Sequence, residues 1–382
     1  PLTENITALK EISDLLVGSG AESATLCFQC GLCDSVCPWN LVKDFMVRKL
    51  VREAQFGLTE IESGEVWQCA SCGKCPSRCP RGVEIVDVML AMRRIASEYD
   101  VLPKGIRHAT ASLTGEGNPW GGEREARANW ASGLSAKEFT EGTELLYFPC
   151  CTQCYDNRTR QSAVATVRIL EKADVDFGIV GSEEVCCGES IRKTGEEGIY
   201  RSLAKQNIKT FIDKGVSKIL VSSPHCYQTL RNEYPEFRVD FDVLHISEYL
   251  LELVREGRLE FTNEYPRKVA YHDPCYLGRQ NGIYDAPREI LREIPGLELV
   301  EMIDSHEDSL CCGGGAGRIW METPKEERLS DLRLEQAVKA GANVLATSCP
   351  YCILNFEDSL LTSGRETEIV IKDVTEIVQE LI

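Results

Sequence analysis

The chain has 382 residues, which is enough for two or three domains, and its 43% hydrophobic and 27% charged residues are ordinary for a globular protein. Its formal net charge of −18 argues against nucleic acid as a partner, because nucleic-acid binding needs a basic surface. No run approaches the roughly 18 apolar residues of a membrane span, and no secretion signal is visible at the start. We therefore expect a cytoplasmic protein, or a subunit held at a membrane through a partner.

The chain contains 19 cysteines, an odd number that argues against a disulfide framework. Thiolates are soft ligands that suit iron–sulfur clusters. So many clustered thiols also indicate a reducing, anaerobic compartment.

The first part of the chain, residues 1–104, is predicted to be helical. Helical periodicity covers Ile6–Val17, Leu41–Ala54 and Val86–Tyr99. Two cysteine runs fall between these stretches, so we expect them in loops held by helices. Residues 105–143 are rich in Gly, Glu and Arg and are predicted to form a linker.

From residue 144 onward, short apolar runs alternate with amphipathic stretches, a pattern typical of α/β units with parallel strands. The predicted strands are Leu145–Phe148, Phe177–Val180, Lys218–Ser222, Lys268–Tyr271, Leu297–Met302 and Asn343–Thr347. The predicted helices between them include Ser162–Lys172, Ile199–Lys214 and Arg328–Lys339. The expected fold class is therefore α plus α/β.

This second part is an internal duplication, with domains predicted at 144–265 and 266–382. Pro149-Cys150 recurs as Pro274-Cys275, and Cys186-Cys187-Gly188 recurs as Cys311-Cys312-Gly313. Arg192 recurs as Arg318, and Ser223-Pro224-His225-Cys226 recurs as Cys349-Pro350-Tyr351-Cys352. A constant offset of 125 to 126 residues indicates one domain written twice.

Both cysteine runs of the first part read C-x-x-C-x-x-C-x-x-x-C-P, the pattern of two-cluster ferredoxins. The fourth cysteine of each such run binds the other cluster. The prediction is thus two [4Fe–4S] cubanes, one on Cys27, Cys30, Cys33 and Cys79, the other on Cys69, Cys72, Cys75 and Cys37. The alternative, two zinc sites, usually needs paired C-x-x-C knuckles instead.

The second repeat offers five cysteines that follow predicted strands: Cys275, Cys311, Cys312, Cys349 and Cys352. We expect them to converge at the carboxyl edge of a parallel sheet, where α/β folds bind ligands. Five thiolates are one more than a cubane takes, and an adjacent pair suits a more open cluster.

At these motifs the chain resembles a known family. The stretches YHDPCYLGR (271–279), CCGGGAGRIW (311–320) and SCPYC (348–352) are similar to the cysteine-rich CCG domain of heterodisulfide reductases. The whole order, a dicluster ferredoxin followed by two CCG repeats, resembles their fused catalytic subunit. The resemblance implies a non-cubane [4Fe–4S] cluster on the five cysteines of the second repeat, which would act as the catalytic centre for disulfide cleavage.

The first repeat departs from the family pattern, because Ser223 stands where a cysteine is expected. Its candidate ligands are Cys151, Cys186, Cys187 and Cys226, with Cys150 and Cys154 as further candidates. Three alternatives stay open: an ordinary cube, a five-ligand cluster completed by Cys154, or no cluster.

Other polar residues near these motifs have weaker predicted roles. Arg192 and Arg318 would offset cluster charge or hold an anionic substrate, with a solvated surface position as the alternative. For His225 and His272, which lie beside candidate ligands, a supporting role is favoured over ligation.

Two functions follow from these patterns. The first is a heterodisulfide-reductase-like enzyme that passes electrons from a partner through the cubanes to a disulfide or thiol substrate. The second is an electron relay in a larger complex without a disulfide of its own. The expected partners are a flavoprotein, a hydrogenase or dehydrogenase, or a membrane quinone subunit.

Overall fold

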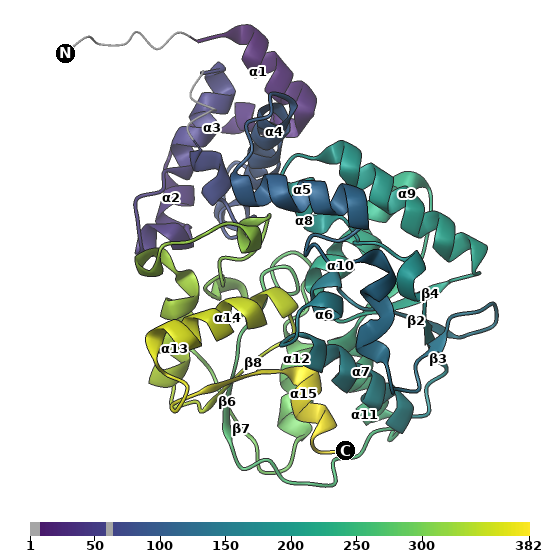
Figure 1. The fold of residues 1–382 in the computed structure, drawn as a ribbon. Helices are drawn as coiled ribbons and strands as arrows, with labels where there is room; N and C mark the ends of the chain where they lie inside the picture. The colour runs from purple at the N-terminus through teal and green to yellow at the C-terminus, as the bar shows by residue number, and fades with distance from the viewer. Residues whose placement is uncertain (1–7, 59–63) are drawn as a thin grey trace. The chain divides into compact units, whose positions relative to one another are not determined.

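A computed structural model describes residues 8–58 and 64–382 of the chain (Figure 1). The described residues form two compact units. Unit 1 contains the residues up to 107 together with 190–197 and 313–329. Unit 2 contains residues 108–189, 198–312 and 330–382.

Unit 1 is helical, as the sequence predicts. Its longer helices are α1 (Lys10–Leu16), α2 (Leu32–Val36), α3 (Val47–Phe56) and α4 (Ile85–Glu98). Helix α4 confirms the prediction for 86–99. The predicted helix at 41–54 begins later, at Val47, because Leu41 ends a separate 3₁₀ turn, η3 (Pro38–Leu41). The start of the first predicted helix, Ile6, lies outside the described residues.

Helix α4 carries the core of unit 1. Its apolar residues recur at helical spacing and are buried, as Val88, Met92 and Ile95 illustrate. They pack with residues of α1 and α3, including Leu16, Leu50 and others around both cysteine runs. The two runs are therefore held over a rigid helical base.

Arg93 ties α4 to two other segments of unit 1. Its buried guanidinium donates hydrogen bonds to the carbonyl oxygens of Val66 (2.7 Å), Cys69 (2.6 Å) and Lys193 (2.9 Å). The same group lies 5.3 Å from the centroid of the Trp67 ring. A single cation thus fixes the start of the second cysteine run and the segment 190–197.

Unit 2 contains two parallel sheets, which confirms the α/β prediction. The first sheet has the order β1-β3-β2-β4-β5, and the second has the order β7-β6-β8-β9. The strands of the first sheet are β1 (Lys137–Glu138), β2 (Leu145–Phe148), β3 (Phe177–Ile179), β4 (Lys218–Val221) and β5 (Asp242–His245). Those of the second sheet are β6 (Lys268–Tyr271), β7 (Glu298–Val300), β8 (Val344–Thr347) and β9 (Val370–Asp373).

Helices connect consecutive parallel strands, as such connections require. In the first repeat they are α6 (Cys151–Tyr155), α7 (Arg160–Lys172), α8 (Glu189–Lys193), α9 (Glu197–Asp213), α10 (Pro224–Gln228) and α11 (Ile246–Arg255). In the second repeat they are α12 (Asp285–Glu293), α13 (Leu329–Lys339) and α14 (Pro350–Ser363), and α15 (Val374–Gln379) follows the last strand. The predicted helices 162–172, 199–214 and 328–339 correspond to α7, α9 and α13. Among the described residues, no helix is both long and apolar enough to cross a membrane.

The two repeats share one hydrophobic core. Residues of the first sheet, such as Tyr147 and Leu220, and residues of the second, such as Val269 and Val344, belong to the same buried cluster. Helix α15 packs against α7, and α12 packs against α11, so each repeat contributes a helix to the other. The two thiol sets described below therefore lie within one packed unit.

The segment predicted as a linker, 105–143, contains regular structure. It holds most of α5 (Lys104–Glu116), the 3₁₀ helix η7 (Arg124–Ala131) and strand β1. Strand β1 pairs with β3 and extends the first sheet at its edge.

Replacing Arg93 with Met should loosen unit 1. The substitution keeps much of the apolar stem but leaves three carbonyl oxygens without their charged donor, so the opening free energy of α4 should fall by about 3 kcal/mol. Hydrogen–deuterium exchange of the α4 amides measures this change. Glu98→Ala, an exposed position on the same helix, is the control and should change it by less than about 0.5 kcal/mol. Equal effects from both variants would contradict the proposed anchoring.

Candidate metal centres

A first cavity in unit 1 is surrounded by four thiols. Its lining contains Cys27, Cys30, Cys33 and Cys79, along with Arg48, Val51, Pro80 and Val83. Three of the thiols come from one run and the fourth from the end of the other run. This is the grouping that the ferredoxin spacing predicts.

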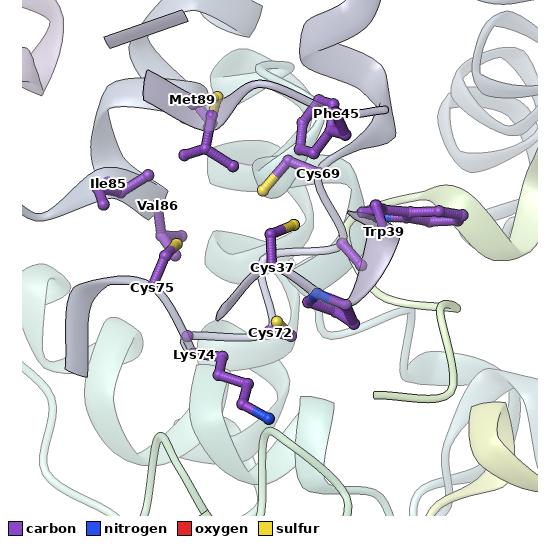
Figure 2. Close-up of a pocket in the computed structure, with 14 residues that line it drawn as sticks. Cys37, Trp39, Phe45, Cys69, Cys72, Lys74, Cys75, Ile85, Val86 and Met89 are labelled. Atoms are coloured by element: carbon purple, nitrogen blue, oxygen red, sulfur yellow. The ribbon is translucent and has the colours of Figure 1, made fainter. Parts of the chain in front are cut away.

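A second cavity has the complementary set. Figure 2 shows Cys37, Cys69, Cys72 and Cys75 around a common space, with Trp39, Phe45 and Met89 beside them and Lys74 pointing away. Its remaining walls are mainly apolar. The fold of unit 1 therefore brings all eight cysteines into two sets of four.

Backbone amides point at the thiols of both runs. The amide nitrogen of Gln29 lies 3.4 Å from the Cys27 sulfur, and the amide of Ser71 lies 3.4 Å from the Cys69 sulfur. Gln29 and Ser71 occupy equivalent positions and both have positive φ, 64° and 51°, which is rare outside glycine. This repeated strained turn directs an N–H at a sulfur, as ligated thiolates require. The sequence gives no signal of this turn, because neither Gln nor Ser favours positive φ.

Burial makes the ionised form of these thiols unfavourable unless a positive charge lies nearby. It raises the pKa of Cys33 to about 11, with the Asp34 carboxylate adding to the effect. Burial likewise raises the pKa of Cys69 and Cys75. A bound cation would supply the missing positive charge, so the donor sets fit metal clusters.

The five cysteines of the second repeat are buried and adjacent to one another. The sulfurs of Cys311 and Cys275 are 4.0 Å apart, and those of Cys352 and Cys312 are 3.4 Å apart. Cys349, which follows β8, interacts with Cys352. The convergence at the carboxyl ends of β6 and β8 agrees with the expectation from the sequence.

A buried ion network positions Cys275. Asp273, two residues before it, accepts hydrogen bonds from both terminal nitrogens of Arg288, at 2.5 and 2.9 Å. Arg288 also pairs with Glu301, and Asp273 accepts the His306 amide. Because such charge-assisted hydrogen bonds fix direction as well as distance, they hold the turn that carries Cys275 in one orientation.

His272 supports the second centre from the other side. Its Nδ1 accepts a hydrogen bond of 3.1 Å from Arg333, so the proton of the neutral ring lies on Nε2. Burial lowers the pKa of His272, which favours that neutral form. The ring lies with the sulfurs of Cys312 and Cys352 in a group whose ligand atoms are within 4.8 Å of one another.

The first repeat also gathers five thiols. The sulfurs of Cys151 and Cys186 are 3.7 Å apart. Side-chain interactions continue from Cys186 to Cys187, from Cys187 to Cys226, from Cys226 to Cys150 and from Cys150 back to Cys151. The adjacent pair Cys150 and Cys151 therefore provides one extra thiol, in place of the cysteine that is missing at position 223.

The remaining cysteine of this repeat, Cys154, lies elsewhere. It packs in the apolar core with Trp130 and Tyr147. Burial raises its pKa to about 12, although the nearby Arg127 lowers it. Ser223 is buried, and its hydroxyl oxygen has no hydrogen-bond partner among the described residues.

The two recurring arginines both belong to segments of unit 1. Arg318 is buried, donates to Thr323 and lies 4.9 Å from the centroid of the Trp39 ring, which lines the second cavity. The alternative of a solvated surface position is therefore wrong for Arg318. Arg192 pairs with Glu197 at 3.2 Å, and the same carboxylate also pairs with Arg94 at 3.2 Å.

Comparison with known proteins agrees with these motifs. A family model described as a cysteine-rich domain matches residues 145–231 and 269–357, and one described as a 4Fe–4S dicluster domain matches 23–83. One of the subunits of the dihydromethanophenazine:CoB–CoM heterodisulfide reductase of Methanosarcina mazei is 29% identical over 93% of both chains. The chain belongs to this family of iron–sulfur oxidoreductase subunits.

Other relatives are longer proteins. A probable iron–sulfur-binding oxidoreductase, FadF, of Bacillus subtilis is 37% identical over 84% of this chain and 47% of its own length. The EtfAB:quinone oxidoreductase of Syntrophomonas wolfei is 34% identical over 83% of this chain and 46% of its own length. The chain thus spans about half the length of these two relatives.

Among solved structures, a hypothetical protein from Helicobacter pylori shares the fold. Its TM-score is 0.55 at 11% identity, over 98% of this chain and 72% of that one.

Removing Arg288 should disorder the turn that carries Cys275. The variant Arg288→Met leaves the buried Asp273 carboxylate unpaired, which should lower the opening free energy of residues 273–278 by about 3–5 kcal/mol. Hydrogen exchange of these amides reports the change. Arg292→Ala, an exposed site on the same helix, is the control. If the opening free energy falls no further in Arg288→Met than in the control variant, the ion network does not hold this turn.

Proposed function

We propose that this chain conducts electrons between a redox partner and a disulfide or thiol substrate. The ferredoxin part of unit 1 would receive single electrons, and the second repeat of unit 2 would be the site of the substrate reaction. The observation that carries the proposal is the set of five buried thiols in the second repeat, one more than a cubane needs.

The proposed ligands of unit 1 follow the two cavities. Cys27, Cys30, Cys33 and Cys79 would hold one [4Fe–4S] cubane, and Cys37, Cys69, Cys72 and Cys75 would hold the other. When bound, such clusters accept and release one electron at a time. The chain's own contribution is the amide hydrogen bonds and the buried Arg93 near Cys69, which favour the anionic thiolate.

In unit 2, Cys275, Cys311, Cys312, Cys349 and Cys352 would hold a non-cubane [4Fe–4S] cluster. Reduction of a disulfide takes two electrons, whereas each cluster supplies one. The five cysteines would hold the cluster, which would supply the electrons one at a time to a disulfide bound beside it.

We further propose a cluster at the first repeat, held by Cys150, Cys151, Cys186, Cys187 and Cys226. The ring of contacts among these five thiols supports it. The loss of a cysteine at Ser223 then does not empty this centre, because the neighbouring pair supplies a fifth sulfur.

The first-repeat centre can be tested by comparing two cysteines on one short helix. Cys151→Ser should remove about four irons per chain and one EPR signal, because a serine oxygen replaces a soft sulfur ligand. Cys154→Ser should keep both, since Cys154 belongs to the core. Iron analysis and EPR of anaerobically purified protein give the answer. Equal iron loss in the two variants would sink this ligand assignment.

The second-repeat centre is tested by Cys349→Ser. This variant should lose the non-cubane signal and disulfide turnover while the two ferredoxin signals remain. Turnover with an artificial electron donor and a panel of disulfides provides the activity measurement. Full turnover by the variant would refute the proposed site.

A relay without a disulfide substrate is the second candidate function. The chain is more similar in sequence to FadF and to an EtfAB:quinone oxidoreductase than to the heterodisulfide reductase subunit. This difference in identity favours the relay. In that case the electrons would pass between an electron-transferring flavoprotein and a quinone-reducing partner. EPR titration with candidate thiols separates the two, because a relay would show no substrate-dependent signal.

A further inference from the structure

A cavity of about 280 Å³ lies between the two repeats of unit 2, and no cysteine is among the described residues that line it. One wall comes mainly from α7 of the first repeat, and the other comes from β9 and α15 of the second repeat. Helices α7 and α15 pack against each other (Figure 1), and the Thr375 hydroxyl donates a hydrogen bond of 3.3 Å to the carbonyl oxygen of Ser162. This space, the inter-repeat cavity, therefore has walls that are held together within one unit.

The walls of the inter-repeat cavity are mostly polar. Amide side chains line it, and its apolar part is limited to Val164 and Ala165. The charged side chains among its described lining are Arg160, Arg168, Lys372, Glu376 and Glu380. The volume lies near the lower end of the range for small-molecule pockets. Such a space suits a small, charged ligand better than an apolar one.

Three of these charged side chains already have partners. Lys372 forms an ion pair with Glu380. One carboxylate oxygen of Glu376 accepts a hydrogen bond of 2.7 Å from Arg158, and the other accepts the Asp373 amide at 2.7 Å. Both carboxylates of the cavity are therefore paired, so neither of them calls for a bound cation.

The two arginines of the cavity differ from these paired groups. Within the part of the chain that the structure describes, the guanidinium groups of Arg160 and Arg168 form no hydrogen bond and no ion pair. The Nε atom of Arg160 is also shielded from solvent, so its N–H has neither water nor a protein acceptor. An unsatisfied buried donor is unfavourable, and an oxygen of a bound ligand would satisfy it. The unpaired positive charge of the cavity thus calls for an anion.

We infer that the inter-repeat cavity binds a small organic dianion, a phosphate or a dicarboxylate, through Arg160 and Arg168. The planar fork of N–H donors on each guanidinium matches the oxygens of a carboxylate or phosphate group, and two such forks match two negative charges. The amide side chains of Gln161 and Gln379 would bind the uncharged part of the ligand. This inference goes beyond the proposed function, because such binding needs no cluster and no electron transfer.

The test is calorimetric titration of the anaerobically purified holoprotein with methyl phosphate and with succinate. At least one of these probes should bind saturably, with one site per chain. Arg160→Gln should weaken that binding by about tenfold or more, because charge-assisted hydrogen bonds to the ligand are lost. Arg292→Gln removes the same charge from an exposed site on α12, outside the cavity, and should bind like the unmodified protein. Preference for one probe identifies the ligand as a phosphate or as a dicarboxylate.

A third variant and a melting curve separate ligand binding from a folding defect. Arg160→Lys keeps the charge but not the planar fork, so it should retain only part of the affinity. Without ligand, Arg160→Gln should unfold at the same temperature as the unmodified protein, since Arg160 has no side-chain partner to lose among the described residues. Added ligand should raise the unfolding temperature of the unmodified protein more than that of the variant. Absence of saturable binding by both probes, or an equal loss of affinity in Arg160→Gln and Arg292→Gln, would overturn the inference.

Discussion

The structure depends on one constraint, the cost of burying thiolates. Every cysteine of the two repeats is buried, and burial makes an isolated thiolate unfavourable. Five thiols gathered at one sheet edge can be ionised together only if cations compensate their negative charge. Bound metal ions would meet that need, because the buried cation behind Cys275, Arg288, is already paired with Asp273 and Glu301.

The duplication shows how this constraint is met twice with different residues. The second repeat uses five cysteines in the family pattern, together with His272 and an ion network behind Cys275. The first repeat has Ser223 in place of one cysteine, and we propose that a thiol of the adjacent pair Cys150 and Cys151 takes the place of that cysteine. The two centres are thus similar in thiol number and different in their supporting groups. That difference suits a donor and an acceptor with unequal potentials.

Much of this could be predicted from the sequence because it depends on local patterns. The bounds of strands β2 and β6 follow from short apolar runs in the sequence. The division of the eight cysteines of unit 1 into two sets of four follows from the ferredoxin spacing. The family pattern favoured Cys151, but Cys154 could not be excluded from the sequence, because both lie on α6 and only packing decides which of them reaches Cys186. The ordered segment 105–143 also escaped prediction, since its pairing with β3 is a tertiary contact.

The iron content of the anaerobically purified chain, together with acid-labile sulfide, tests the central claim most directly. The account predicts about 16 irons per chain, from four clusters of four irons each. A value near eight irons, with the ferredoxin signals alone, would contradict the claim that both repeats of unit 2 are cluster-binding centres. Zinc in place of iron would contradict the electron-transfer function as a whole.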